Sequence, residues 1–149
     1  MLESYEINNA TLAIIPINTR ICKVIEHDKN YIVNKSSIEI IDDSCRYFGS
    51  TLQGRHDATK ELIGVSYKSP IIIEETRNII FFPTSSPRFN NCYWLALNKI
   101  KNSEKVDNFC QITFNNGSEL ELNISYESLQ NQILRATMLE STLKKRINS

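Results

Sequence analysis

Short runs of apolar residues that alternate with polar ones, or that are apolar throughout, recur along the chain and predict β-strands. Turn-forming residues such as Asn8-Asn9 and Pro16 interrupt these runs. The predicted strands are residues 5–7, 11–15, 21–26, 31–34, 65–67, 71–74, 79–82, 93–100, 109–115 and 118–123. The Asn116-Gly117 pair between the last two strands is the strongest short hairpin signal in the sequence.

A three- and four-residue spacing of apolar positions predicts a helix that begins after Ser36. Ser36 and Glu39 have the spacing of a capping box, in which each side chain accepts a hydrogen bond from the backbone N–H of the other residue. Gly49 is expected just beyond the end of this helix, where a left-handed backbone conformation is common. The expected apolar face consists of Ile38, Ile41, Cys45 and Phe48.

Two further helices are predicted from the same signals. Ser50 is expected to cap a helix of about residues 51–63, which ends at Gly64. Ser125 is expected to cap a long terminal helix of about residues 126–146. Its apolar positions are Leu129, Ile133, Leu134, Ala136, Met138, Leu139, Leu143 and Ile147. The sequence leaves open whether this apolar row is buried within one copy of the chain or partly across a two-fold axis between copies.

The order of these elements indicates the fold class. Strands come first, followed by two helices, more strands and one helix, and most connections between strands are as short as those of hairpins. This order predicts an α+β fold with a largely antiparallel sheet, two short central helices and a long C-terminal helix. A chain of 149 residues is expected to form a single domain.

Composition narrows the class of protein. The chain has 17 basic and 17 acidic residues and therefore no net charge, which is unusual for a nucleic-acid-binding protein. The four cysteines form no C-x-x-C pair, and with only two histidines neither a structural metal site nor a cofactor is expected. The acidic N-terminus does not resemble a signal peptide, and no apolar run is long enough for a membrane helix. A cytoplasmic protein with reduced thiols and no membrane partner is expected.

The positive charge is concentrated in residues 76–103, which contain four basic and no acidic side chains. This segment also contains the only tryptophan, Trp94, three of the six phenylalanines and several amides. Such a composition suits a surface that meets a polyanion and packs on the core behind it. The alternative is a hairpin whose solvent face is basic without a binding function. The basic residues are Arg77, Arg88, Lys99 and Lys101.

Three cations on the two short helices extend this basic segment in one interpretation, and they are Arg46, Arg55 and Lys60. In the other interpretation they belong to a mixed helix surface, because Asp57 and Glu61 lie among them. The sequence does not distinguish the two.

Signatures of catalysis are missing from the sequence. It contains no glycine-rich phosphate loop, no G-x-S-x-G and no H-E-x-x-H motif. Cys45 and His56 could in principle act as nucleophile and base, but Cys45 belongs to the apolar face of the first helix and is expected to be a core residue. We therefore expect that the protein is not an enzyme.

Several segments resemble the ComK family of competence transcription factors from Gram-positive bacteria. The resemblance extends over nearly the whole chain, and Asn131-Gln132 and Arg135 in the last helix belong to it. The segments, in the order of the family, are LESYEI (2–7), SCRYFGSTLQGR (44–55), IIFFPT (79–84), CYW (92–94), ITFNNG (112–117) and ISY (124–126).

The resemblance implies that residues 1–149 form a DNA-binding domain of an activator of DNA-uptake genes, which lies on the nucleoid and meets RNA polymerase indirectly. Proteins of this family are described as binding paired AT-rich boxes through the minor groove, as dimers that assemble in pairs. The minor groove is read by Arg, Lys, Asn and Gln. We assign Arg88, Asn90 and Asn91 as groove-reading residues, and the phosphate contacts to Arg77, Lys99, Lys101, Arg46, Arg55 and Lys60.

Two alternatives to this function are left open, and the first follows from the resemblance. Family members continue beyond the long helix with a tail that an adaptor for proteolysis recognises, whereas this chain ends at Ser149, so adaptor recognition is not carried over through that motif. The chain is thus expected to be a short form, and a paralogue that modulates a full-length activator without binding DNA is the main alternative. The second alternative is a small enzyme that uses Cys45 or Cys92, which would need a depressed thiol pKa.

Overall fold

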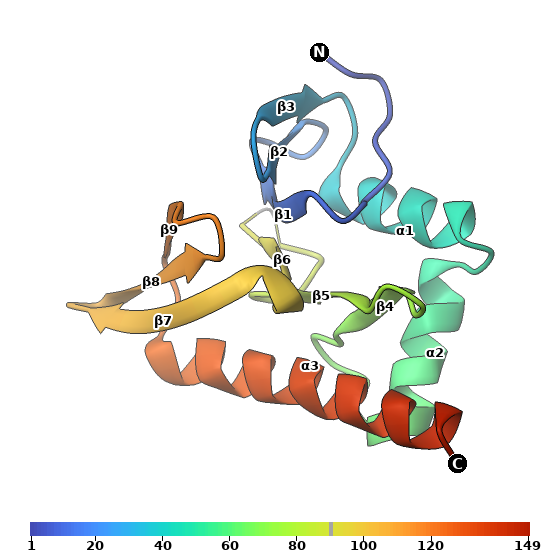
Figure 1. The fold of residues 1–149 in the computed structure, drawn as a ribbon. Helices are drawn as coiled ribbons and strands as arrows, with labels where there is room; N and C mark the ends of the chain where they lie inside the picture. The colour runs from blue at the N-terminus through green and yellow to red at the C-terminus, as the bar shows by residue number, and fades with distance from the viewer. Residues whose placement is uncertain (90) are drawn as a thin grey trace.

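A six-stranded antiparallel sheet forms the middle layer of the protein (Figure 1). The computed structural model describes residues 1–89 and 91–149. The strand order is β3-β2-β1-β6-β5-β4, so that β1, β6 and β5 occupy its centre. The strands are β1 (Thr11–Pro16), β2 (Cys22–Glu26), β3 (Asn30–Val33), β4 (Ile71–Glu74), β5 (Ile79–Pro83) and β6 (Trp94–Ala96).

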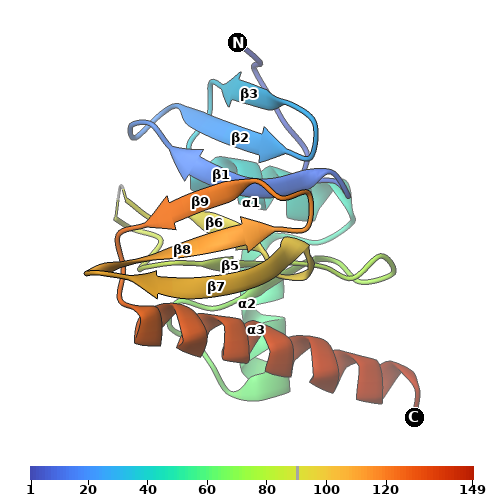
Figure 2. The same cartoon turned by 60° about the vertical axis from the view of Figure 1, so that its left-hand side comes forward.

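A second, three-stranded antiparallel sheet packs in front of the first, as Figure 2 shows. It is formed by β7 (Ile100–Val106), β8 (Phe109–Phe114) and β9 (Glu119–Leu122). The short 3-10 turn η1 (Leu97–Lys99) connects it to β6. The apolar side chains between the two sheets form one core cluster together with the buried face of the C-terminal helix.

Three helices complete the layers (Figures 1 and 2). Helix α1 (Ser37–Tyr47) covers the other face of the six-stranded sheet, where Ile40, Ile41 and Cys45 join a second core cluster. Helix α2 (Leu52–Ile63) stands at the β4 edge and contacts both α1 and α3. Helix α3 (Tyr126–Ile147) runs beside the three-stranded sheet and contacts β5. The α+β class, the two central helices and the long C-terminal helix are confirmed.

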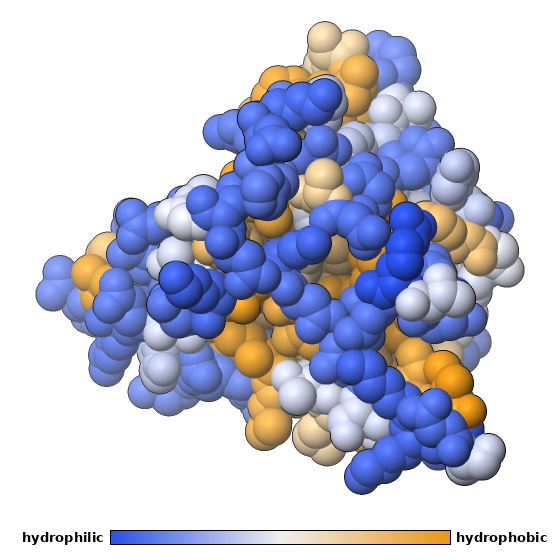
Figure 3. All heavy atoms as spheres, viewed as in Figure 1, coloured by the Kyte–Doolittle hydropathy of each residue, from blue (hydrophilic) through white to orange (hydrophobic). Residues whose placement is uncertain are grey.

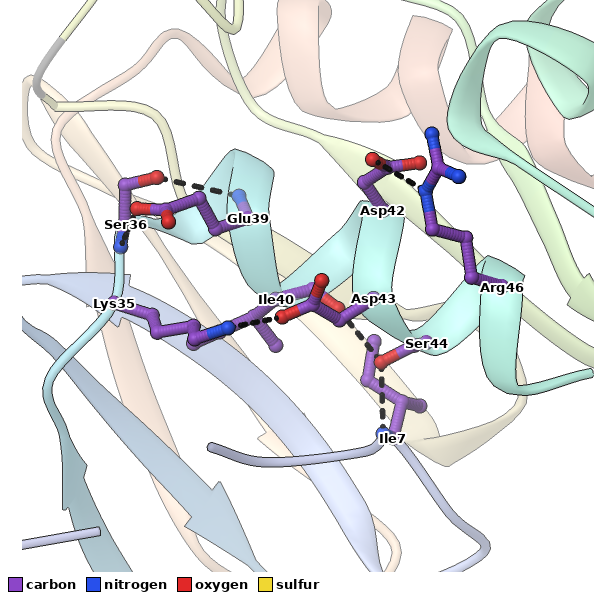
Figure 4. A network of polar contacts seen from close by, with 9 residues as sticks. All are labelled: Ile7, Lys35, Ser36, Glu39, Ile40, Asp42, Asp43, Ser44 and Arg46. Atoms are coloured by element: carbon purple, nitrogen blue, oxygen red, sulfur yellow. Dashed lines mark hydrogen bonds and ion pairs between the residues drawn. The ribbon is translucent and has the colours of Figure 1, made fainter. Parts of the chain in front are cut away.

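The capping box predicted for α1 is present (Figure 4). The Glu39 N–H donates to Ser36 Oγ at 3.2 Å, and the Ser36 N–H donates to Glu39 Oε1 at 3.1 Å. The predicted apolar face is shifted, because Ile40 and Ser44 are fully buried while Ile38 and Phe48 are only partly buried. Ser44 tolerates burial because its Oγ donates to the Ile40 carbonyl and accepts the N–H of Ile7.

Two of the predicted strands do not form. The expectation for residues 5–7 is wrong, since the Ile7 N–H donates to Ser44 of α1 instead of a neighbouring strand. The expectation for residues 65–67 is also wrong, because the side chain of Arg135 donates a hydrogen bond to the Tyr67 carbonyl at 3.0 Å. In both places a side chain from another element replaces the ladder partner that a strand requires.

Two element boundaries also differ from the prediction. Thr51, and not Ser50, caps α2, since its hydroxyl accepts the Gly54 N–H at 2.9 Å. The strand predicted over residues 93–100 is divided by η1, and a new strand, β7, begins at Ile100. The division lets the chain leave the first sheet and start the second, a change of direction that the apolar alternation does not encode.

Candidate nucleic-acid interface

The loop between β5 and β6 presents Arg88 to solvent. Arg88 and Asn91 are exposed, and Phe89 beside them is 53% exposed. The guanidinium carbon of Arg88 lies 5.4 Å from the centre of the Phe89 ring, within the range of a cation–π contact. Arg88 forms no ion pair within residues 1–89 and 91–149. Asn90, the remaining groove-reading candidate, lies outside the described residues.

Hydrogen bonds close the base of this loop. The Thr84 N–H donates to the Tyr93 carbonyl at 2.9 Å, and the Tyr93 N–H donates to Thr84 Oγ1 at 3.0 Å. Within the loop, the Phe89 N–H donates to the carbonyl of Ser86. Arg88 is therefore held on a folded loop with a closed base.

Lys68 and Arg135 lie near this loop and were not among the residues that the sequence pointed to as DNA contacts. Pro87, which precedes Arg88, and Lys68 line the same pocket. Arg135 on α3 donates to the carbonyl of Tyr67, the neighbour of Lys68. No pattern in the sequence signals Lys68, whereas Arg135 is part of the family resemblance. Lys68 therefore lies beside the Arg88 loop, and Arg135 contacts the segment that carries Lys68.

The other cations of residues 76–103 lie at the opposite end of β5. Arg77 precedes β5 and Arg88 follows it, so the two arginines are separated by the length of the strand. Arg77 and Lys99 line a cavity of about 60 Å³, and Lys101 follows on β7. The amides that line this cavity are Asn8, Asn9, Asn78 and Asn98. Figure 3 shows a hollow between the positions of β1 and β4, with apolar side chains at its bottom and hydrophilic ones around it.

Three of the arginines assigned to phosphate contacts already have acidic partners. Arg46 pairs with Asp42 at 3.0 Å (Figure 4), Arg55 with Glu75 at 3.0 Å, and Arg77 with Glu74 at 3.4 Å. The side chain of Arg55 is only 16% exposed. Lys60 is exposed on α2 and has no such partner in the part of the chain that the structure describes.

The carboxylates of two of these pairs are stabilised in the charged form. The backbone N–H of Leu52 donates to Asp42 and lowers its pKa, and Arg46 lowers it further. Burial acts to raise the pKa of Glu74, but hydrogen bonds from Thr76 and Arg77 outweigh it and lower the pKa overall. These acids stay ionised at neutral pH, so a phosphate near Arg46 or Arg77 would share the guanidinium with a carboxylate.

The cysteines have the properties of core residues. All four are buried, and burial raises the pKa of Cys45 and of Cys22 to about 11 and raises that of Cys92 as well. A nucleophilic thiol needs a shift in the opposite direction. The two thiols of the enzyme hypothesis, Cys45 and Cys92, therefore lack the property that it requires.

Neither a metal centre nor a membrane span is found in the described part of the chain. No group of three or more His, Cys, Asp or Glu side chains there is placed to hold a metal ion. None of the described helices combines the length and the apolar character that a membrane crossing needs.

Comparison with known families decides the family of this protein. A family model described as "ComK protein" matches residues 2–148. The chain belongs to the ComK family. A relative, the competence transcription factor of Bacillus subtilis (strain 168), is 39% identical over 151 residues, which cover 99% of this chain and 79% of the relative. No solved structure matches the chain significantly.

Membership in the ComK family confirms the resemblance noted in the sequence and supports its interpretation as a transcription factor. The roles assigned to Arg88, Asn91 and the other cations stay predictions. The structure adds that Arg88 and Asn91, on the β5–β6 loop, are separated from Arg77 and Lys99, which lie at the other end of β5.

Proposed function

We propose that this protein is a DNA-binding transcriptional activator of competence genes that binds double-stranded AT-rich DNA, mainly through the minor groove. The observation that carries the proposal is the exposed Arg88, which no acidic residue of the described chain neutralises, on a loop whose base is closed. Support also comes from the name of the ComK-family relative, a competence transcription factor.

Minor-groove chemistry suits this loop. The narrow groove of AT-rich DNA has an enhanced negative potential that attracts inserted arginine side chains. Its base edges offer mainly acceptors, which the guanidinium of Arg88 and the amide of Asn91 can meet as donors. Lys68 and Arg135 flank the loop and would contact phosphates, whereas Lys99 and Lys101 would reach DNA only from the other end of the sheet.

Fluorescence anisotropy on duplex DNA tests the proposal. We expect a duplex with two AT-rich boxes to bind more tightly than a GC-rich duplex of equal length. Because phosphate contacts release counterions, the affinity is expected to fall as the salt concentration rises. Equal weak binding to both duplexes would contradict AT preference. A folded protein that associates with a full-length homologue but binds neither duplex would instead favour the alternative of a modulating paralogue.

Replacement of Arg88 by alanine is expected to weaken binding to the AT-rich duplex by roughly 1–3 kcal/mol, because a groove contact and its charge are lost. Arg20→Ala is the matched control, since Arg20 is also exposed but lies in the β1–β2 loop and is not assigned to a DNA contact. We expect it to change the affinity much less. If Arg88→Ala binds the AT-rich duplex as tightly as the wild type, Arg88 does not contact the groove. The comparison of the two duplexes would then still test whether the protein prefers AT-rich DNA.

We also infer that two copies associate through the outer face of α3. Leu134 and Met138 lie one turn apart on this face and are 57% and 46% exposed. They belong to the apolar row of this helix, whose other face is buried in the core. An exposed apolar row on an otherwise packed helix is typical of a contact between copies.

Introducing a charge into this row is expected to separate the copies. A Leu134→Glu, Met138→Glu variant should sediment as a monomer at concentrations at which the wild type is a dimer or a pair of dimers. Ile17→Glu is the control, because Ile17 is similarly exposed but lies in the β1–β2 loop. Unchanged sedimentation of the double variant would place the contact elsewhere.

A further inference from the structure

A pocket of about 320 Å³ opens beside the Arg88 loop, and the proposed contacts with DNA do not account for it. It lies between the first turns of α1 and α2, residues 66–69 and Pro87. Its volume is at the lower end of the range for small-molecule sites. The apolar lining residues are Ile38, Leu52, Ile71, Pro87 and Trp94. The polar ones include Gln53, His56, Ser66 and Lys68.

Trp94 forms part of the floor of this pocket. The side chain is 1% exposed and lines the pocket, and its Nε1–H has no hydrogen-bond partner in the described structure. A buried donor without a partner is costly, and most buried polar groups have one. Because the nitrogen itself has almost no accessible surface, a ligand in the pocket would pack over the indole and would not reach this N–H.

The charges around the pocket indicate which kind of ligand fits. Among the described residues no aspartate or glutamate lines it, and Lys68 contributes a cation. Lys68 is held in a left-handed backbone conformation with a φ of 50°, and its carbonyl accepts a hydrogen bond from Gln132 at 2.9 Å. His56 Nε2 lies 3.1 Å from the Ser66 carbonyl and links α2 to the same segment. Helices α3 and α2 therefore hold the backbone segment that carries Lys68 in place.

We propose that this pocket binds a small carboxylic acid with an apolar body, such as a single ring or a short alkyl chain. The body packs against Ile38, Leu52 and Ile71. The carboxylate faces the positive charge of Lys68, and the ligand body covers the indole of Trp94. This combination of a mostly apolar wall with a few convergent polar groups is typical of small-molecule sites.

The intrinsic fluorescence of Trp94 reports on binding directly, because it is the only tryptophan in the chain. The full chain is titrated with benzoate and octanoate and, as matched neutral probes, with benzyl alcohol and octanol. We expect a saturable change in fluorescence with at least one carboxylate. Its dissociation constant should be at least tenfold lower than that of the matching alcohol, since only the acid carries the charge that Lys68 would meet.

Two lysine variants test the assignment. Lys68→Gln is expected to weaken carboxylate binding about tenfold while leaving the alcohol unchanged, which corresponds to about 1.4 kcal/mol. Lys101→Gln removes a lysine that does not line the pocket and should have no effect. The proposal is overturned if no carboxylate gives a saturable change, if acid and alcohol bind equally, or if Lys68→Gln binds the acid like the wild type. No DNA is present, so the result does not depend on the proposed function.

Discussion

Replacing Phe82 by alanine is expected to lower the free energy of unfolding by about 3–5 kcal/mol. Phe82 is fully buried in β5, a strand of the middle layer, and belongs to the cluster that joins both sheets to α3. The truncation removes apolar surface from the core and leaves a cavity that surrounding strands, held by ladders on both sides, cannot close.

Phe89 provides the control for this change. It is the same residue type seven positions later, but it is 53% exposed in the β5–β6 loop. Phe89→Ala should alter the free energy of unfolding by less than about 0.5 kcal/mol. Urea unfolding followed by circular dichroism measures both. A loss of less than about 1 kcal/mol in Phe82→Ala would mean that the two layers do not share this core as described.

The second large effect is expected at Gln132, which is fully buried in α3. Its Nε2 donates to the carbonyls of Lys68 at 2.9 Å and of Pro83 at 2.8 Å. Leucine has a similar size but no donor, so Gln132→Leu leaves two carbonyls without their partner. At roughly 1–3 kcal/mol for each unsatisfied group, we expect a loss of about 2–5 kcal/mol in unfolding free energy.

Gln130→Leu is the matched control on the same helix. Gln130 is only partly buried, and it donates to the hydroxyl of Ser103, which water can replace. A loss below about 1 kcal/mol is therefore expected there. If urea unfolding shows equal losses for both variants, the buried bonds of Gln132 do not hold residues 67–68 and the end of β5 to α3. That result would also mean that Gln132 does not fix the backbone of Lys68 beside the pocket.

Much of the fold could be predicted because its signals are short in range. The capping box of Ser36 and Glu39, the glycines at the ends of α1 and α2, and the Asn116-Gly117 hairpin depend on neighbours within a few residues. The two predicted strands that failed, at residues 5–7 and 65–67, are places where Ser44 and Arg135 from distant elements take the backbone groups. A propensity argument has no access to such partners.

The candidate site was less accessible to prediction. Arg77 and Arg88 are eleven residues apart in a basic segment, which suggested one continuous surface. Because β5 lies between them as an extended strand, they emerge at opposite ends of the sheet. The ion pair between Arg55 and Glu75 likewise depends on how α2 meets the β4–β5 turn, whereas the partners of Arg46 and Arg77 are four and three residues away in the sequence.

The sequence by itself determined the α+β class, the three helices and most strands, since these rest on local chemistry. It also determined membership in the ComK family, since the family segments follow one another along the chain. Only the tertiary structure decided that the basic segment forms two groups, that Lys68 lies beside the Arg88 loop, and that Trp94 and Lys68 line one pocket. Burial and pockets are properties of distances between residues far apart in the chain, and packing of the layers sets those distances.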